Sequence, residues 1–167
     1  MINLLIAKTI LIGIGATITF DLWAQFLKFT FKITPSNICV VGRWLLYMPQ
    51  GIFRHTNIIK APVKRGECFT GWIAHYSIGV TLTLLYLILV PVHWLFNPTL
   101  LPALLYGICT VVFPLFVLQP SLGLGIASSK TSNPTFARIK SIMTHIIFGI
   151  GLWLSTIAAN YSILNWI

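Results

Sequence analysis

Four long apolar stretches constrain this chain more than any other feature of its sequence. They run over about residues 2–27, 69–96, 99–118 and 139–161. A helix needs roughly 20 apolar residues to cross the hydrocarbon of a bilayer, and each stretch is long enough to do so. Only 8% of the residues are charged, whereas a water-soluble domain carries about a quarter. We therefore expect an all-α, polytopic membrane protein in which residues 1–167 form a single four-span domain.

Nearly all of the positive charge falls in the two longer connections between these stretches, or at their edges. Ten of the eleven basic residues lie there, and with four spans the two connections share one side of the membrane. Cytoplasmic loops carry an excess of Lys and Arg, so we expect this side to face the cytoplasm and both termini to face outward. Topology thus explains the net charge of +9, and no nucleic-acid partner is expected. The ten residues are Lys28, Lys32, Arg43, Arg54, Lys60, Lys64, Arg65, Lys130, Arg138 and Lys140.

Two local features refine this picture. Residues 35–36 offer a helix start, residues 38–48 are mainly apolar, and a proline follows them, so we expect a short interfacial helix in the first cytoplasmic loop. Its apolar residues would enter the headgroup region while Arg43 meets lipid phosphates. Within the third span, Pro114 predicts a kink, because proline removes a backbone N–H from the helix.

The two basic loops also provide candidate contacts for an anion or an anionic lipid headgroup. These are Arg43, Arg54, His55, Lys130 and Arg138. Glu67 precedes the second span, and we expect it to form a surface ion pair with Lys64 or Arg65, which would stabilise the fold little.

Three ionisable residues lie within the spans, where such groups are costly and mark candidate functional sites. From the rise of about 1.5 Å per residue, Asp21, His75 and His145 lie roughly 8–12 Å inside the cytoplasmic edge. Each shares a helix face with small residues four positions away, such as Gly79 beside His75 and Gly149 beside His145. Small residues allow helices to approach closely. We expect the three side chains to point into the bundle as a polar cluster.

Several roles for this cluster stay open. It could be a structural hydrogen-bond network, in which Asp21 fixes the tautomer of a histidine, or a relay for protons or ions. A metal or haem site on His75, His145 and Asp21 is a further alternative, as is lipid-modifying catalysis. No cofactor is strongly indicated.

Other patterns in the sequence give little support to enzymatic chemistry. Residues 125–131 resemble a P-loop, but Ser129 replaces the second glycine and no strand precedes it, so nucleotide hydrolysis is not expected. The cysteines Cys39, Cys68 and Cys109 are far apart and form no CxxC pair, so they predict neither a disulfide framework nor a redox pair.

These observations favour a small membrane binding or transport-type component over an enzyme. A membrane enzyme or metal/haem-binding subunit acting at the cytoplasmic interface, and a structural partner of a larger complex, remain as alternatives. Since four spans are few for a complete transport pathway, we expect a homo-oligomer or a membrane partner.

Several motifs resemble those of one family of short bacterial membrane proteins, the domain of unknown function 2938. They are Gly-Ala-Thr (15–17), Asp-Leu-Trp (21–23), Val-Gly-Arg-Trp (41–44), Phe-Arg-His (53–55), Gly-Trp-Ile-Ala-His-Tyr (71–76), Gln-Pro (119–120), Gly-Leu-Gly-Ile-Ala-Ser-Ser-Lys-Thr (123–131) and Thr-His-Ile-Ile-Phe-Gly (144–149). The resemblance implies a location in the bacterial inner membrane. It supplies no catalytic residues, because the family has no established activity.

Overall fold

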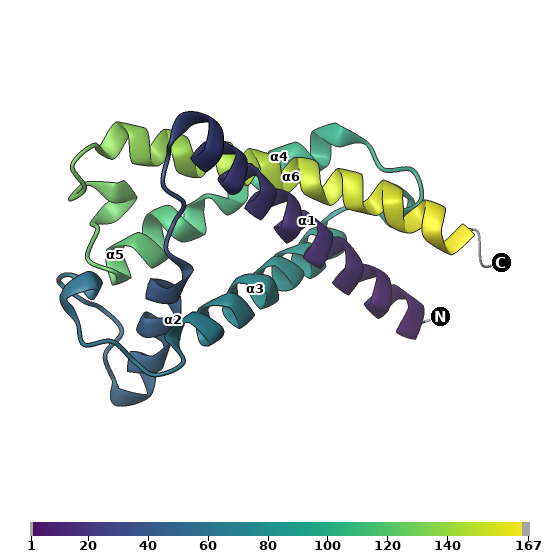
Figure 1. Ribbon diagram of the computed structural model, residues 1–167. Coiled ribbons are helices and arrows are strands. Elements are labelled where there is room, and N and C mark those ends of the chain that lie inside the picture. The colour runs from purple at the N-terminus through teal and green to yellow at the C-terminus, as the bar shows by residue number, and fades with distance from the viewer. Residues whose placement is uncertain (1, 165–167) are drawn as a thin grey trace. The chain divides into compact units, whose positions relative to one another are not determined.

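The computed structural model is helical throughout the part of the chain that it describes. It describes the backbone of residues 2–164 and the side chains of residues 5–161, and no strand occurs among them. The longer helices are α1 (Ile2–Phe31), α2 (Ile38–Tyr47), α3 (Glu67–Leu89), α4 (Leu100–Thr110) and α6 (Pro134–Leu164), all shown in Figure 1. The all-α prediction is confirmed.

Within the part of the chain that the structure describes, four segments are long and apolar enough to span a membrane, as predicted. They are Leu5–Phe31, Glu67–Leu89, Leu100–Ser121 and Pro134–Tyr161. The second helix ends at Leu89 instead of continuing to residue 96, because Pro91 cannot continue it, and a 3₁₀ turn, η3 (Val92–Leu95), follows. The fourth begins earlier than predicted: Pro134 is its first residue, and Asn133 caps it by accepting a hydrogen bond from the Phe136 N–H at 3.0 Å.

The third span is interrupted where Pro114 predicts a kink. Helix α4 ends at Thr110, and a π-helical segment, η4 (Pro114–Leu118), leads into the short helix α5 (Gln119–Ser121). A π-helical turn is a local departure from α geometry, so the expected irregularity at Pro114 is confirmed.

The chain divides into two compact units. The first, here the bundle unit, comprises Met1–Thr34, Tyr76–Thr110 and Thr144–Ile167. The second, here the loop unit, comprises Pro35–His75 and Val111–Met143. The boundary crosses α3 between His75 and Tyr76.

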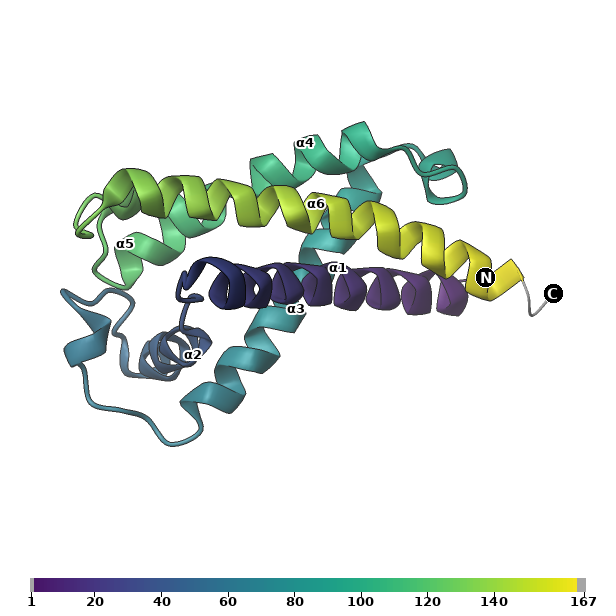
Figure 2. The same ribbon diagram turned by 45° about the horizontal axis from the view of Figure 1, so that its top comes forward.

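Small residues bring the helices of the bundle unit together. Helices α1 and α6 run side by side in both ribbon views (Figure 1, Figure 2), and a Cβ on Gly151 would lie 2.9 Å from the Ala16 Cα. On α1, a Cβ on Gly13 would lie 2.7 Å from the Val80 Cα of α3. Real Cβ atoms do not approach that closely, so glycine is required at both contacts. The predicted packing through small residues is confirmed here.

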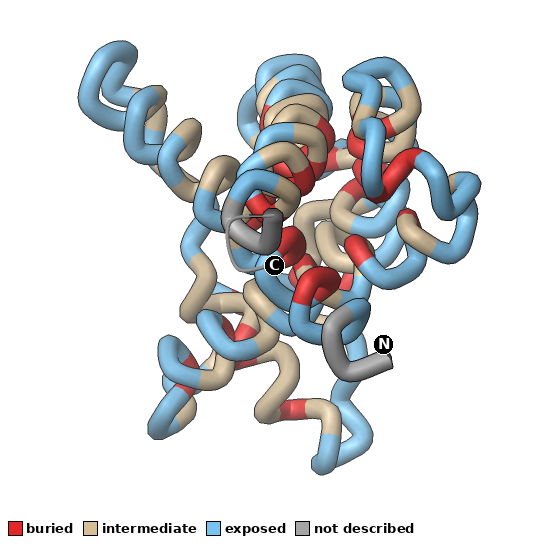
Figure 3. Tube along the Cα trace, turned by 90° about the vertical axis from the view of Figure 1, so that its right-hand side faces the viewer, coloured by how far each residue is buried: buried red, intermediate tan, exposed pale blue. Residues whose placement is uncertain are grey.

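Much of the apolar surface of the spans faces outward. Between 22% and 39% of the most apolar window of each span is buried, and exposed and buried stretches alternate along the helices in Figure 3. The exposed side chains include Leu22, Ile88, Leu101 and Leu154. A water-soluble protein rarely exposes so much contiguous apolar surface, whereas a bilayer solvates it. The protein is therefore a multi-pass membrane protein.

In the loop unit, the two basic connections lie directly against each other. The His55 N–H donates to the Ser121 carbonyl at 2.8 Å, and the Ile58 N–H donates to the Leu122 carbonyl at 3.1 Å. Gly123, with φ +88°, permits this contact, since a Cβ there would run into the Thr56 carbonyl. The predicted short helix is present as α2, capped by the Asn37 side chain.

Candidate functional site

Asp21 contacts α3 inside the bundle unit. Its Oδ2 accepts a hydrogen bond from the Tyr76 hydroxyl at 3.0 Å, and both residues lie within apolar spans. The contact continues the α1–α3 packing, because Asp21 lies one helical turn beyond Thr17, whose side chain packs against Gly79. The structure thus pairs a carboxylate with a phenol at the level where a polar site was predicted.

Sequence reasoning missed Tyr76, although a signal for it was present. Spacing of four residues from Gly79 selects His75, whereas spacing of three selects Tyr76, and both positions share a helix face with Gly79. The register between α1 and α3, which brings Tyr76 to Asp21, is not a local property of the sequence.

His145 contacts α4 within the same unit. Its Nδ1 lies 2.8 Å from the Thr110 hydroxyl oxygen, and that hydroxyl donates its hydrogen to the Gly107 carbonyl at 2.6 Å. Because a carbonyl only accepts, the hydroxyl oxygen is left to accept from His145. The network therefore places a proton on Nδ1 and, in the neutral imidazole, the lone pair on Nε2.

The predicted cluster of three ionisable residues is divided between the two units. Asp21 and His145 belong to the bundle unit, where the His145 ring packs edge-on against Phe20, the neighbour of Asp21, with centroids 6.0 Å apart. His75 is the last residue of the loop unit before the boundary in α3, and its ring packs against Trp72 at 5.7 Å. The three-way cluster stays a prediction.

Arg43 is the centre of a buried ion pair in the loop unit. Its Nε and Nη2 donate to the two carboxylate oxygens of Glu67 at 2.7 and 2.8 Å, and its Nη1 donates to the Ala61 carbonyl at 3.0 Å. Both residues of the pair are 8% exposed. The hydrogen bonds to Glu67 raise the pKa of the guanidinium above its ordinary value. With its donors engaged inside the unit, Arg43 serves to hold α2 against the start of α3.

The expected partner of Glu67 was wrong. The carboxylate pairs with Arg43 in place of Lys64 or Arg65, and Lys64 contributes its backbone N–H at 3.0 Å. The Lys64 Nζ lies over the Tyr47 ring, 4.2 Å from its centroid. The pair is buried, so removing one partner would leave the other charge uncompensated, which would not happen at the predicted surface contact.

The cysteine prediction was also wrong for one pair. Cys39 and Cys68 form a disulfide, whereas Cys109 is free. Cys39 is the second residue of α2 and Cys68 the second of α3, and the two helix starts pack closely because Gly42 and Gly71 face each other's backbone. Residue spacing alone does not show this contact.

The remaining candidates of the basic loops lie at the surface of the loop unit. Arg54, Lys130 and Arg138 are exposed, and the Arg138 Nε donates to the Ala127 carbonyl at 2.7 Å. His55 is half-buried, packs on Tyr47 at 4.9 Å, and its Nε2 has no hydrogen-bond partner among the described residues. Three exposed cations thus remain able to meet an anionic headgroup.

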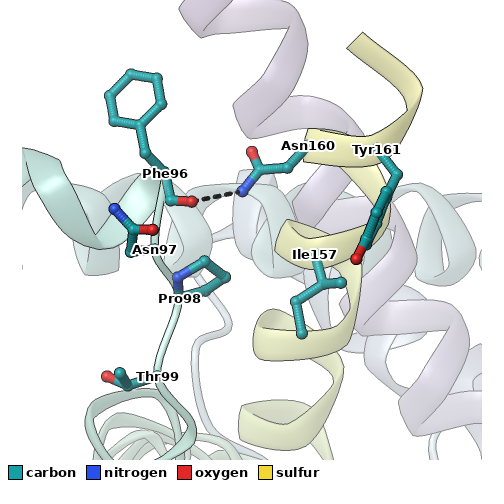
Figure 4. Close-up of a pocket in the computed structure, with 7 residues that line it drawn as sticks. All are labelled: Phe96, Asn97, Pro98, Thr99, Ile157, Asn160 and Tyr161. Atoms are coloured by element: carbon teal, nitrogen blue, oxygen red, sulfur yellow. Dashed lines mark hydrogen bonds between the residues drawn. The ribbon is translucent and has the colours of Figure 1, made fainter. Parts of the chain in front are cut away.

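A second group of polar contacts in the bundle unit joins α1, α6 and the turn that follows α3. Lys8, which is 7% exposed, donates to the Asn160 side chain and lies over the Phe96 ring. The Asn160 amide donates to the Leu95 and Phe96 carbonyls at 3.1 and 3.2 Å. An open pocket of about 520 Å³ adjoins this network, as Figure 4 shows. It is lined by Phe96, Asn97, Pro98, Thr99, Ile157, Asn160 and Tyr161.

Fold and site together define a small, multi-pass, all-helical membrane protein with polar residues inside its spans. Within the described residues, no three His, Cys, Asp or Glu side chains gather closely enough to hold a metal ion. The family model described as "Protein of unknown function (DUF2938)" matches residues 10–159, and the chain belongs to this family. The resemblance expected from the sequence motifs is thereby confirmed. No curated protein and no solved structure matches the chain.

Proposed function

We propose that this protein is a binding or transport-type component of the bacterial inner membrane. In this proposal the two basic loops face the cytoplasm and both termini face outward. Asp21, Tyr76 and His145 of the bundle unit form the working site, and His75 stays a candidate from the sequence. The excess of Lys and Arg in the two basic loops supports the orientation.

The hydrogen bond between Asp21 and Tyr76 carries the proposal. A carboxylate inside an apolar span is costly to keep, and Asp/His chains within membranes form proton relays. The chain has only two acidic residues, and Glu67 is engaged by Arg43. Asp21 is therefore the acidic group to which we assign the binding of a proton or a cation within the spans, with the Tyr76 hydroxyl as its hydrogen-bond donor.

Proton flux into liposomes tests this role. The purified protein is reconstituted with a pH-sensitive dye inside, and a potassium gradient imposes a membrane potential. We expect flux above that of empty liposomes, abolished by Asp21→Asn and reduced by Tyr76→Phe. Tyr106→Phe is the matched control, because the Tyr106 hydroxyl donates to the Leu82 carbonyl and has no part in the site.

Two results would overturn the proposal. One is a wild-type flux no greater than that of empty liposomes, over a range of monovalent cations. The other is a folded Asp21→Asn protein that conducts like the wild type. Visible absorption and metal content of the same sample decide the alternative of a metal/haem-binding subunit. If neither shows a stoichiometric group, a purely structural partner or a membrane enzyme remains.

The small number of spans bears on whether this protein works alone or with other membrane proteins. Because four spans are few for a pathway, we propose a homo-oligomer or a complex with another membrane protein. The exposed Arg54, Lys130 and Arg138 would contact anionic lipid at the cytoplasmic face, where each cation near the surface contributes about 1 kcal/mol. Native mass spectrometry tests both points, through the oligomer mass and through the loss of retained anionic lipid in an Arg54→Gln/Lys130→Gln variant.

A further inference from the structure

The disulfide lies in the unit that carries most of the basic residues. Cys39 and Cys68 join α2 to α3 within the loop unit, and Cys68 is exposed while Cys39 is half-buried. The positive-inside rule assigns the first basic loop, with Cys39 in it and Cys68 just after it, to the cytoplasmic side. Thiols there are kept reduced, and the disulfides that form in the cytoplasm of mesophiles are mostly transient, catalytic or redox-sensing. A permanent structural bond does not fit this location.

We propose that Cys39 and Cys68 form a reversible thiol–disulfide site, opened by cytoplasmic thiol reductants and closed by oxidants. The proposal rests on the orientation given under Proposed function. It assigns a redox-modification site to two residues that are not among the intramembrane polar residues.

The positions of Cys39 and Cys68 favour thiol–disulfide exchange. Both cysteines lie in the first turn of a helix, where the N-terminal dipole favours the thiolate over the thiol. A reductant thiolate attacks the sulfur of Cys68, the more exposed residue of the pair, the Cys39 sulfur leaves as a thiolate, and a mixed disulfide forms. A second reductant thiolate then attacks the reductant sulfur of that mixed disulfide and releases Cys68 as a thiolate. Two electrons pass to the protein, and the oxidised reductant leaves as a disulfide.

Other contacts hold α2 in place when the bond is open. The backbones of the two helix starts meet at Gly42 and Gly71, where no Cβ could fit, and the Arg43–Glu67 ion pair lies beside the disulfide in the sequence. Reduction therefore removes one of three attachments without unfolding the unit. We expect it to loosen residues 51–66, which lie between α2 and α3 and carry four exposed or half-buried basic residues.

Thiol trapping in cells tests the site. Cells expressing a Cys109→Ser variant are quenched in acid, and free thiols are tagged with a maleimide of high mass under denaturing conditions. In unstressed cells we expect two tags on each chain, and after treatment with a membrane-permeant thiol oxidant we expect none. Cys39→Ser in the same background should carry one tag in both conditions.

Each contrary outcome has a distinct meaning. If the pair stays reduced after the oxidant, the redox site is overturned and the orientation stands. If the pair is oxidised in unstressed cells, the proposal is also overturned. A membrane-impermeant reductant, added after permeabilising the outer membrane, then shows whether the orientation has failed too, since it opens the bond only when the loop unit faces outward.

Limited trypsin digestion of the purified protein tests the structural consequence. Cleavage at Arg54, Lys60, Lys64 and Arg65 should be several-fold faster in the reduced protein than in the oxidised one, because local opening exposes a loop to proteases. Cys39→Ser should behave like the reduced protein with or without reductant. Equal rates in both states of the wild type would overturn the switching role.

Discussion

Tyr76 donates a hydrogen bond to Asp21 because α1 and α3 pack in an antiparallel register that the small residues set. Gly13 meets Val80 and Thr83, Thr17 meets Gly79 one turn further along α1, and Asp21 follows one turn later. Each turn forward along α1 is matched by one turn back along α3. The polar contact is therefore a consequence of close helix packing as well as of its own chemistry.

Filling the close contact between α1 and α3 should separate the helices. A Cβ on Gly79 would collide with the buried Thr17 side chain, so Gly79→Leu should cost about 1–3 kcal/mol or more by overpacking. We expect a clear fall in the melting temperature in detergent, together with loss of the Asp21–Tyr76 contact. Ser77→Leu is the control, since Ser77 is exposed on the same helix. An equal fall in both variants would contradict the register.

The sequence predicted the spans well because their length and apolarity are local properties. It also predicted the small-residue faces, since helical spacing decides which residues share a face. It did not identify Tyr76 as the residue that donates to Asp21, because the register between two helices is a tertiary property. Cys39 with Cys68, and Arg43 with Glu67, were missed for a related reason. Each pair joins segments that lie more than twenty residues apart.

Breaking the buried ion pair should destabilise the loop unit strongly. Removing one partner leaves the other charge buried without compensation, at a cost of about 3–5 kcal/mol. We expect Arg43→Gln to lower the unfolding midpoint in denaturant, whereas the double variant Arg43→Met/Glu67→Leu should recover part of the loss. The matched control is Arg65→Gln, because Arg65 is exposed and surface pairs contribute little. A loss at Arg65→Gln as large as at Arg43→Gln would show that Glu67 has a different partner.

The Thr110 hydroxyl should fix the tautomer of His145. It donates to the Gly107 carbonyl and accepts from Nδ1, so neutral His145 should carry its proton on Nδ1 predominantly. Nitrogen-15 NMR of histidine-labelled protein reads the tautomer from the two ring nitrogen shifts. In Thr110→Val, which removes the acceptor, the population should move toward Nε2–H. A wild-type signal already dominated by the Nε2–H form would contradict this hydrogen-bond arrangement.

The Lys8–Asn160 contact should matter for stability, since a buried ammonium depends on its partners. Both acidic residues of the chain lie elsewhere, Asp21 beside Tyr76 and Glu67 beside Arg43, so Asn160 provides the oxygen that Lys8 meets. Asn160→Leu leaves the charge without that acceptor, which costs about 1–3 kcal/mol or more. We expect a lower melting temperature for Asn160→Leu and a smaller loss for Lys8→Met/Asn160→Leu, in which neither partner remains. Asn97→Leu is the control, because Asn97 lines the same pocket but is exposed. If the double variant is no more stable than Asn160→Leu, the destabilisation comes from the broken contacts of Asn160 with the Leu95 and Phe96 carbonyls, and Lys8 has no part in it.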